Sequence, residues 1–425
     1  MGKFKGKFRL VKRRDDYYRH FTALDIGTDM VKALVIRRDR HEGIVLGVGR
    51  EPQEPIAMSG GAIADIESVI RSTNRALEAA EDMAGLNPPP GQAVVGVAGE
   101  LVKGFNSSAA YPRTKPDTKI REGEIRNLLN LLQKRALREA QHLLELERSY
   151  GELDARLVHS AITGVRIDGY PVANPLGFQG HNLDITVFNT FAPLTHIRAI
   201  ETVVVELDLE LVAAVAQPYA IARACAVDEV YEAGGIFIDI GGGTTDVALM
   251  RDGGIEGTRM FNLGGRSFTR RLSTALGITF EQAEAKKLRH SEGLLGADEE
   301  RRVAELLRSD AEVLIRGLVL CLDELSRGER LPSGIYLCGG GSLLPEVLNE
   351  LEHGKWAEGL PFARSPSARL LMPSDVTGLN DTTGLLNSPR DIGPMALANH
   401  ALRLQADEKD VVTGVMRRVL KSLKV

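Results

Sequence analysis

Short apolar runs alternate with amphipathic stretches along this chain, and each kind of run predicts a different element. Near the start, the runs 22–25, 31–37 and 43–49 are typical of strands, and a glycine turn joins the first two. Residues 67–84 have the apolar period of a helix that ends before three consecutive prolines, and 93–98 are typical of a buried strand. The opening of the chain therefore predicts three strands, a helix and a further strand.

The middle of the chain is more varied. Residues 99–120 are rich in Ser, Pro, Lys and Gly, which predicts loop or edge structure. Leucines recur through 122–149 and predict a long helix. The elements expected after this helix are strands at 157–162, 165–167, 181–190 and 211–216, and helices at 194–206 and 219–230.

The second half of the chain repeats the pattern of its opening. Strands are expected at 236–240 and 246–250, with a polar, glycine-rich loop between them, and a third strand near 257–262. Strand–turn–strand units followed by helices in both halves predict a duplicated α/β core. Open α/β sheets bind phosphates where their strands end, so the ends of the first strand in each half are the places to search for a site.

Both halves carry the same polar motif at that place. Asp25 and Gly27 follow the first strand of one half, and Asp239 and Gly241 follow the first strand of the other. A single Asp-x-Gly is a common turn, but two facing loops would grip a polyphosphate, because glycine lets backbone N–H groups approach an anion closely and hydroxyls add donors. Asp25 and Asp239 are expected to hold a Mg²⁺ ion that partly offsets the phosphate charge. The other residues assigned to the phosphates are Thr28, Gly242, Gly243, Thr244 and Thr245, and Lys32 is a further candidate for cofactor binding.

Composition narrows the class of protein. With 425 residues the chain is too long for one core, so two or more lobes are expected. It is 43% apolar and 26% charged, and it has no apolar run long enough to span a bilayer and no apolar signal-peptide core. The three cysteines lack CxxC spacing, which favours buried thiols in a reducing compartment over a metal or disulfide site. These features predict a cytoplasmic protein.

The formal net charge of −4 hides two basic ends. Residues 1–14 carry seven Lys and Arg and no acid, and 413–425 carry four and no acid, which predicts that the tails meet an anionic surface. Near the C-terminus an apolar stripe at helical spacing predicts an amphipathic helix in a membrane interface. A final helix packed on the body of the protein is the alternative. The stripe consists of Val412, Val415, Met416, Val419, Leu420 and Leu423.

The two Asp-x-Gly loops resemble the phosphate motifs of the actin, Hsp70 and sugar-kinase superfamily. The glycine-rich run 335–345 resembles the adenosine motif, where the chain passes close to the nucleoside. The run 283–290 looks like the helix whose Glu and Lys reach the ribose and adenine, although an ordinary surface ion pair is the alternative for two such residues three apart. The resemblance assigns the nucleoside to Glu284, Lys287, Gly339, Gly340, Gly341 and Ser342.

Within that superfamily the chain resembles the bacterial cell-division family FtsA. The run 168–183 has the Asn-Pro and Gly-x-x-Leu pattern of that family, and 228–239 looks like its approach to the second phosphate loop. The resemblance covers about 21–404 and implies an α/β, actin-like, duplicated two-lobed fold with four subdomains, one of them the small inserted subdomain of this family. A short amphipathic membrane helix at the C-terminus is also a family trait.

The resemblance predicts how the chain is divided. The expected parts are a basic N-terminal arm (1–20), the core of a first lobe (21–97, 183–232 and 385–404), the inserted subdomain (98–182), a second lobe (233–384, with a small subdomain at about 266–330) and a membrane-targeting helix (405–425). The N-terminal arm is predicted to be either a second amphipathic anchor or a disordered basic segment, with equal weight.

The resemblance implies a function as well. It predicts a protein that binds ATP and Mg²⁺, self-assembles, and tethers the tail peptide of the tubulin-like protein FtsZ to the anionic inner membrane surface, at the cytoplasmic face of the division site, without nucleic acid. Gln217 stands where many relatives carry Glu, and an amide orients a water without deprotonating it. Gln217 and Asp239 are thus the candidate catalytic residues of a weak ATPase at most.

Two other classes share the phosphate and adenosine loops. A pilus-assembly or rod-shape type of actin-like ATPase adaptor is the nearest alternative, and a pilus adaptor would lack the 168–183 run. A small-molecule kinase would need a catalytic Asp on the substrate side, and no further Asp-x-Gly site stands out in the sequence. Substrate-dependent ATP turnover would distinguish the kinase from the other two.

Overall fold

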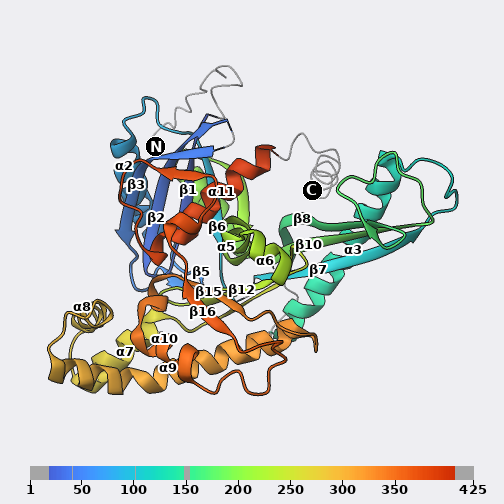
Figure 1. Cartoon of the computed structure of the whole chain (residues 1–425). Helices are drawn as coiled ribbons and strands as arrows, with labels where there is room; N and C mark the ends of the chain where they lie inside the picture. Colours follow the sequence, from blue (N-terminus) through green and yellow to red (C-terminus); the bar gives the residue numbers. More distant parts are fainter. Residues whose placement is uncertain (1–18, 41, 101, 148–153, 407–425) are drawn as a thin grey trace.

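The computed structural model describes residues 19–40, 42–100, 102–147 and 154–406. Nearly all of the basic N-terminal arm and the whole predicted membrane stripe at 412–423 lie outside these residues. No helix in the part of the chain that is described is both long and apolar enough to cross a membrane. Two large sheets form the body of the protein (Figure 1).

The first sheet has six strands and contains the first Asp-x-Gly motif. Its central strand β1 (His20–Ile26) is antiparallel to β2 (Met30–Asp39) and parallel to β6 (Gln92–Val97). The strand order is β11-β6-β1-β2-β3-β17. The remaining strands are β3 (Glu42–Pro52), β11 (Glu210–Ala216) and β17 (Leu379–Asp381).

Four helices pack with this sheet, and two glycines of β3 show how closely. A Cβ at Gly47 or Gly49 would overlap a backbone carbonyl of the helix that lies on β3, so only glycine permits this approach. The helix that ends at residue 406 contacts β1, β2 and β6. The four helices are α2 (Ile66–Ala84), α4 (Leu194–Glu206), α5 (Gln217–Cys225) and α11 (Ile392–Ala406).

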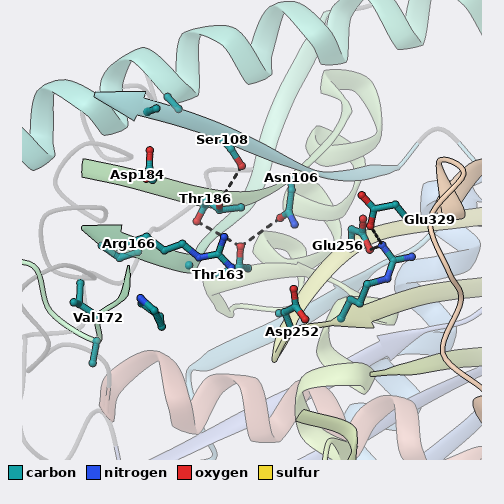
Figure 2. A pocket seen from close by; sticks show the side chains of 18 residues that line it. Asn106, Ser108, Thr163, Arg166, Val172, Asp184, Thr186, Asp252, Glu256 and Glu329 are labelled. Atoms are coloured by element: carbon teal, nitrogen blue, oxygen red, sulfur yellow. Dashed lines mark hydrogen bonds and ion pairs between the residues drawn. The ribbon is translucent and has the colours of Figure 1, made fainter. Parts of the chain in front are cut away.

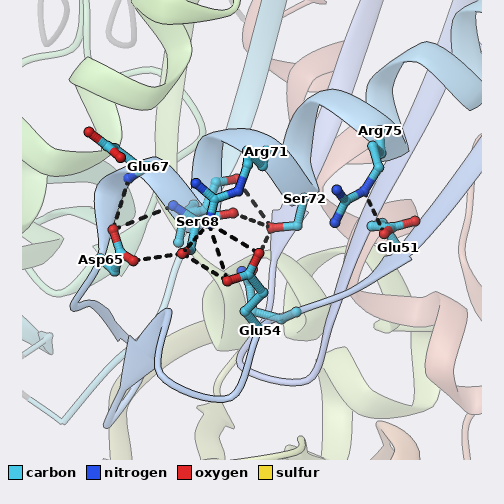
Figure 3. Close-up of polar contacts among 10 residues, drawn as sticks. Glu51, Glu54, Asp65, Glu67, Ser68, Arg71, Ser72 and Arg75 are labelled. Atoms are coloured by element: carbon cyan, nitrogen blue, oxygen red, sulfur yellow. Dashed lines mark hydrogen bonds and ion pairs between the residues drawn. The ribbon is translucent and has the colours of Figure 1, made fainter.

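Figure 3 shows how α2 is anchored where it begins. The carboxylate of Asp65 accepts hydrogen bonds from the backbone N–H groups of Glu67 and Ser68, which satisfies donors that a helix start leaves unpaired. The Ser68 hydroxyl lies 3.0 Å from Oε2 of Glu54, and both carboxylate oxygens of Glu54 accept from Arg71 at 3.2 Å. These contacts hold the start of α2 against the segment that follows β3.

The second sheet has nine strands and contains the second Asp-x-Gly motif. Strand β12 (Gly235–Ile240) is antiparallel to β13 (Thr245–Arg251) and parallel to β15 (Gly334–Cys338), as β1 is to β2 and β6. The duplicated core predicted from the sequence is confirmed. The order is β16-β15-β12-β13-β14-β7-β10-β8-β9. The other strands are β14 (Gly254–Phe261), β16 (Ser367–Leu370), β7 (Lys103–Pro112), β10 (Asn182–Pro193), β8 (Ala155–Ile167) and β9 (Tyr170–Pro171).

Helices from the second half bury the strands around β12 in a core of their own. The longest of them, α9 (Ala297–Ser326), is the orange helix along the lower edge of Figure 1. The others are α7 (Gly265–Leu276), α8 (Phe280–Ser291) and α10 (Pro345–His353). Helix α6 (Asp228–Ala233) instead places Val230 in the core that includes the first sheet. The short elements are β4 (Met58–Ser59), β5 (Ala62–Ile63), and the 3-10 helices η1 (Gly340–Leu343), η2 (Pro373–Asp375) and η3 (Pro389–Asp391).

Strands β7, β10 and β8 extend beyond the two lobes together with helix α3 (Glu122–Glu147), at the right of Figure 1. Leu128, Leu129 and Leu132 of α3 are buried against strand residues that include Ile185 and Val187. The expected boundary between the inserted subdomain and the first lobe falls at the start of β10, which pairs with both β7 and β8.

Three local predictions were wrong. The segment 99–120 contains the ten-residue strand β7, although its composition predicted loop or edge structure. It is a strand because it pairs along its whole length with β10 and meets β14, where a Cβ at Gly104 would overlap the Thr258 hydroxyl. The two strands predicted within 157–167 are one, β8, and the helix predicted at 219–230 is interrupted between α5 and α6.

Candidate functional site

A cavity of about 760 Å³ lies between the two sheets, and its walls come from both halves of the chain. The two Asp-x-Gly loops, the glycine loop after β15 and helix α8 all contribute to it. Segments up to about 370 residues apart in the sequence therefore meet around one space. The predicted site residues that line it are Asp25, Gly27, Thr28, Lys32, Gln217, Asp239, Gly241, Gly242, Thr244, Glu284, Lys287, Gly339, Gly340 and Gly341.

Three predicted site residues are not part of the cavity lining: Gly243, Thr245 and Ser342. The hydroxyl of Thr245 donates to the carbonyl of Leu263 at 2.8 Å, and that of Ser342 donates to the carbonyl of Gly339 at 2.7 Å. Both hydroxyls hold the loops in shape, and the phosphate contact expected for Thr245 and the nucleoside contact expected for Ser342 stay predictions.

The two Asp-x-Gly loops touch each other across the cavity. A Cβ at Gly242 would lie 2.5 Å from the Cβ of Asp29, and a Cβ at Gly243 would lie 2.9 Å from the Thr28 hydroxyl. The glycines are needed here because the opposite loop leaves no room for a side chain. This close approach lets both loops face one small group, which is the arrangement expected for gripping a phosphate chain from two sides.

In the first loop, the aspartate is paired with a lysine. Lys32 lies directly opposite Asp25 in the β1–β2 register, with its Nζ 3.2 Å from Oδ2 of Asp25. The same Nζ donates to the carbonyl of Arg390 at 2.8 Å. Burial lowers the pKa of Lys32, but the carboxylates of Asp25 and Asp239 outweigh burial and hold the pKa above its ordinary value. The first loop therefore carries an ion pair whose charges cancel.

In the second loop, the equivalent cross-strand position holds an acid. Asp246 lies opposite Asp239 in the β12–β13 register, and both side chains are buried. Burial raises the pKa of Asp239 to about 6, although Lys32 acts in the opposite direction. Burial, and then the charge of Asp239, raise the pKa of Asp246 well above its usual range. Two neighbouring buried carboxyl groups create a place that favours a cation or a proton.

Tight packing fixes the carboxylate of Asp239. Gly339 has a φ of +82°, and a Cβ there would overlap Oδ1 of Asp239. On the other side the amide Nε2 of Gln217, the first residue of α5, lies 3.5 Å from Oδ2 of Asp239. A Cβ at Gly393 would overlap that same amide nitrogen. The position of Gln217 in the cavity wall is therefore compatible with the predicted orientation of a water, and this role stays a prediction.

The carboxylates fit the expected Mg²⁺ ion. Among the described residues, no group of three or more His, Cys, Asp or Glu side chains could hold a metal by itself. Mg²⁺ is usually held by one or two carboxylates together with waters and substrate phosphates, so a complete protein cage is not required. Asp239 is a better candidate than Asp25 for a Mg²⁺ ligand, because Asp25 already pairs with Lys32. Oδ1 of Asp246 is buried and has no hydrogen-bond partner among the described residues, so this carboxylate is also available.

Helix α8 brings Glu284 and Lys287 to the cavity wall as a bonded pair. Nζ of Lys287 lies 2.7 Å from Oε2 of Glu284 and also donates to the Thr269 hydroxyl at 2.9 Å and the Gly265 carbonyl at 3.1 Å. The side chain of Lys287 is 9% exposed, which argues against the surface ion pair that was the alternative. The pair joins α8 to α7, and its contact with ribose and adenine stays a prediction.

Sequence reasoning missed several charged residues that line the cavity. Arg50 on β3 donates to Asp391 at 2.7 Å, and Arg390 lies beside Gly340. Arg266 of α7 and Asp246 also line the cavity. Asp246 could have been found, because it ends the polar run that follows Asp239. Arg50, Arg390 and Asp391 carry no such signal, since only the fold brings β3 close to η3.

A second cavity, of about 750 Å³, lies over the face of the sheet formed by β7, β10 and β8 (Figure 2). Its floor is polar: the hydroxyls of Ser108 and Thr186 lie 2.9 Å apart, and the Thr163 hydroxyl lies 3.4 Å from Oδ1 of Asn106. At one end Arg251 forms an ion pair with Glu329 at 2.7 Å. None of the residues predicted to form a site lies here.

Comparison with known proteins gives a consistent family. A sequence model of the family described as "Cell division protein FtsA" matches residues 236–356. FtsA of Pseudomonas aeruginosa is 28% identical over 365 residues, which span 80% of this chain and 82% of that protein. FtsA of Neisseria meningitidis is 26% identical over 422 residues, or 94% of each chain.

A solved structure confirms the fold. The structure described as "PilM-PilN type IV pilus biogenesis complex" matches with a TM-score of 0.64 at 16% identity, covering 90% of this chain and 98% of that one. At this identity the likeness speaks for the fold alone. Taken with the two glycine loops that meet at one cavity, the comparisons confirm the resemblance found in the sequence: over most of its length the chain is similar to cell-division proteins of the FtsA family, and its fold is actin-like.

Proposed function

We propose that this chain is an ATP-binding, actin-like cell-division protein that self-assembles and tethers FtsZ to the cytoplasmic membrane. The observation that carries the nucleotide site is the convergence of both Asp-x-Gly loops, the Gly339–Gly341 loop and α8 around one cavity. The relatives in the FtsA family support the cell-division role. Nucleotide binding, the FtsZ tail and the membrane contact are all parts of this proposal.

Different residues of the cavity are assigned to different parts of the nucleotide. The loop N–H groups and the hydroxyls of Thr28 and Thr244 would face the phosphates, and the Gly339–Gly341 loop with Glu284 would face the nucleoside. A Mg²⁺ ion held at Asp239 and Asp25 would supply positive charge that offsets the phosphate oxygens. Binding would draw the two lobes together, because each loop belongs to a different sheet.

Hydrolysis is proposed to be slow. The amide of Gln217 lies 3.5 Å from the carboxylate of Asp239, and an amide cannot accept a proton from water as a carboxylate would. Positioning and charge neutralisation still permit phosphoryl transfer at a low rate. Nucleotide binding, rather than turnover, is therefore the main event at this site.

Membrane attachment is assigned to the C-terminal stripe of Val412, Val415, Met416, Val419, Leu420 and Leu423. A single amphipathic segment of this length binds weakly, and a filament would multiply weak contacts by avidity. Self-assembly driven by ATP would then control how firmly the protein, and the FtsZ tail bound to it, is held at the cytoplasmic face of the membrane. We assign the division site as its location.

Co-sedimentation with anionic vesicles tests the proposal. The full chain and a version ending at Asp410 are spun with phosphatidylglycerol vesicles, with and without ATP and Mg²⁺, and then with a synthetic FtsZ tail peptide. We expect the full chain to pellet, more strongly with ATP, and to carry the peptide with it, and the shortened chain to stay in the supernatant. A full chain that stays in the supernatant under every condition contradicts the membrane role, and a chain that pellets without the peptide contradicts the FtsZ role.

A further inference from the structure

Five cationic side chains line the cavity between the lobes: Lys32, Arg50, Arg266, Lys287 and Arg390. Three of them already neutralise a carboxylate, since Lys32 pairs with Asp25, Arg50 with Asp391 and Lys287 with Glu284. Among the described residues, no carboxylate forms an ion pair with Arg266 or Arg390. These two guanidinium groups are therefore the positive charges that the cavity leaves for an anionic ligand.

The two arginines lie beside different loops. A Cβ at Gly340 would lie 3.6 Å from Nε of Arg390, which places this side chain at the loop assigned to the nucleoside. Arg266 instead follows Gly265 in the first turn of α7, and its backbone N–H donates to the carbonyl of Gly242 at 2.7 Å. The backbone of Arg266 is thus bonded to the second phosphate loop, and its position rather than its charge alone distinguishes it.

Arg266 also reaches the first phosphate loop. Its Nη1 donates to the carbonyl of Thr28 at 3.1 Å, across the line where the two loops touch. One residue therefore contacts both loops: its backbone N–H bonds to the second loop, and its guanidinium bonds to the first. The guanidinium therefore lies in the wall of the cavity, at a point where the two loops are close together.

The hydrogen bonding of Arg266 is incomplete. A guanidinium has five N–H donors, and the carbonyl of Thr28 occupies one of them. Nε is buried and has no hydrogen-bond partner among the described residues. The ring of Phe280 lies under the group, with its centroid 5.5 Å from the guanidinium carbon, and so supports its plane without supplying an acceptor. A planar guanidinium with unused N–H donors can bind two oxygens of one phosphate group at the same time.

We propose that Arg266 reads the terminal phosphate of the bound nucleotide, so that the site prefers a nucleoside triphosphate to a diphosphate. The guanidinium exchanges its contact with the Thr28 carbonyl for oxygens of the last phosphate group, and it transmits the presence of that group from the second lobe to the first. Arg266 is a specificity-determining residue, and this inference rests on the nucleotide site of the proposed function.

Isothermal titration of the full chain with ATP, ADP and AMP, each with Mg²⁺, tests the inference. In Arg266→Gln we expect the affinity for ATP to fall at least tenfold and that for ADP and AMP to change less than threefold. Arg270→Gln is the matched control, because Arg270 is exposed on the same helix and loses the same charge. We expect it to change all three affinities less than twofold. Arg266→Lys keeps the positive charge but loses the planar guanidinium. Its affinity for ATP should therefore lie between those of the wild type and Arg266→Gln.

The outcomes separate this inference from the proposal beneath it. Equal loss of ATP and ADP affinity in Arg266→Gln, or no loss of either, overturns the role of Arg266 while the nucleotide site stands. A wild-type chain that binds none of the three nucleotides overturns the nucleotide site itself. A loss that Arg270→Gln reproduces would show that net charge, and not the position of Arg266, sets the preference. If Arg266→Gln does not fold, the ratio of ATP to ADP affinity in Arg266→Lys decides.

Discussion

The two Asp-x-Gly loops have the same backbone and opposite electrostatics. In the first half, the residue opposite Asp25 across the hairpin is Lys32, and the two form an ion pair. In the second half, the residue opposite Asp239 at the equivalent position is Asp246, and burial raises the pKa of both carboxyl groups. The two halves thus share the register of the motif, while a single cross-strand position carries opposite charges.

This difference assigns different tasks to the two loops. The first loop is neutral as a pair and can hold its shape without a ligand. The second loop concentrates buried negative charge, which is costly until a proton or a cation arrives. A cation would therefore be held mainly from the second half, with the first half closing over it. The predictions that follow test this asymmetry, beginning with the largest expected effect.

Removing the charge of Asp239 should stabilise the protein in the absence of ligand. At pH 7.5, with EDTA and without nucleotide, we expect Asp239→Asn to raise the free energy of unfolding by up to about 3 kcal/mol, because ionising this buried carboxyl is unfavourable. The same change should weaken Mg²⁺-dependent ATP binding at least tenfold. Urea unfolding and titration calorimetry measure the two effects. Asp25→Asn is the control from the other loop and should destabilise, because it leaves Lys32 without its partner.

Removing the charge of Lys32 should have the opposite sign. Lys32→Met leaves three acids near one another without their cation, and we expect a loss of about 3 kcal/mol in unfolding free energy, the lower end of the range for breaking a buried pair. The double change Lys32→Met with Asp25→Asn should recover part of this loss. If the single and double variants are equally unstable, the pairing of Lys32 with Asp25 does not account for the effect.

Changing the amide of Gln217 to a carboxylate would add a charge on the acidic side of the cavity. Gln217→Glu places an acid beside Asp239, so we expect about 1–2 kcal/mol of destabilisation without metal and recovery when Mg²⁺ and ATP are added. On the proposed function the same variant should hydrolyse ATP several times faster than the wild type. Unchanged phosphate release in a variant that still binds ATP would show that the side chain at 217 does not limit turnover.

The smallest effect concerns a buried charge cluster in the second half, formed by His290, Glu300 and Glu346. His290 of α8 lies 2.8 Å from Glu346 and 2.9 Å from Glu300, and it is 1% exposed. The hydrogen bond to Glu346 raises the pKa of His290 against the effect of burial, and Glu300 adds to the rise. A raised histidine pKa contributes stability that is fully present below about pH 6.5 and lost as pH rises through the higher value in the folded state.

Thermal melting between pH 6 and pH 9 checks this cluster. We expect the wild type to lose about 1 kcal/mol across that range from this source, and His290→Gln to show a flatter profile. His353, exposed on α10, offers the matched variant His353→Gln, which should leave the slope unchanged. A wild-type profile as flat as that of His290→Gln would mean that the cluster is not charged, and the acids of the second half would then be less well compensated than the distances indicate.

Much of this organisation could be predicted from local pattern. The strands that carry Asp25 and Asp239 lie where their apolar runs placed them, and the glycine loop at 339–341 and the helix bearing Glu284 lie where the resemblance placed them. These features are local, because a strand end and a tight turn are encoded by neighbouring residues. Strand β7 was missed since its small and polar residues carry no strong period and become a strand only through pairing with β10 and β14.

The sequence alone determined that the chain has a duplicated α/β core with matching polar loops and a resemblance to the FtsA family. Only the tertiary structure decided what surrounds each loop. Lys32 and Asp246 stand seven residues after Asp25 and Asp239, but their opposite effects depend on cross-strand register and burial. Arg266, Arg50 and Asp391 reach the cavity from segments with no shared motif. Charge interactions depend on distance and burial in space, and neither quantity can be derived from the order of residues along the chain.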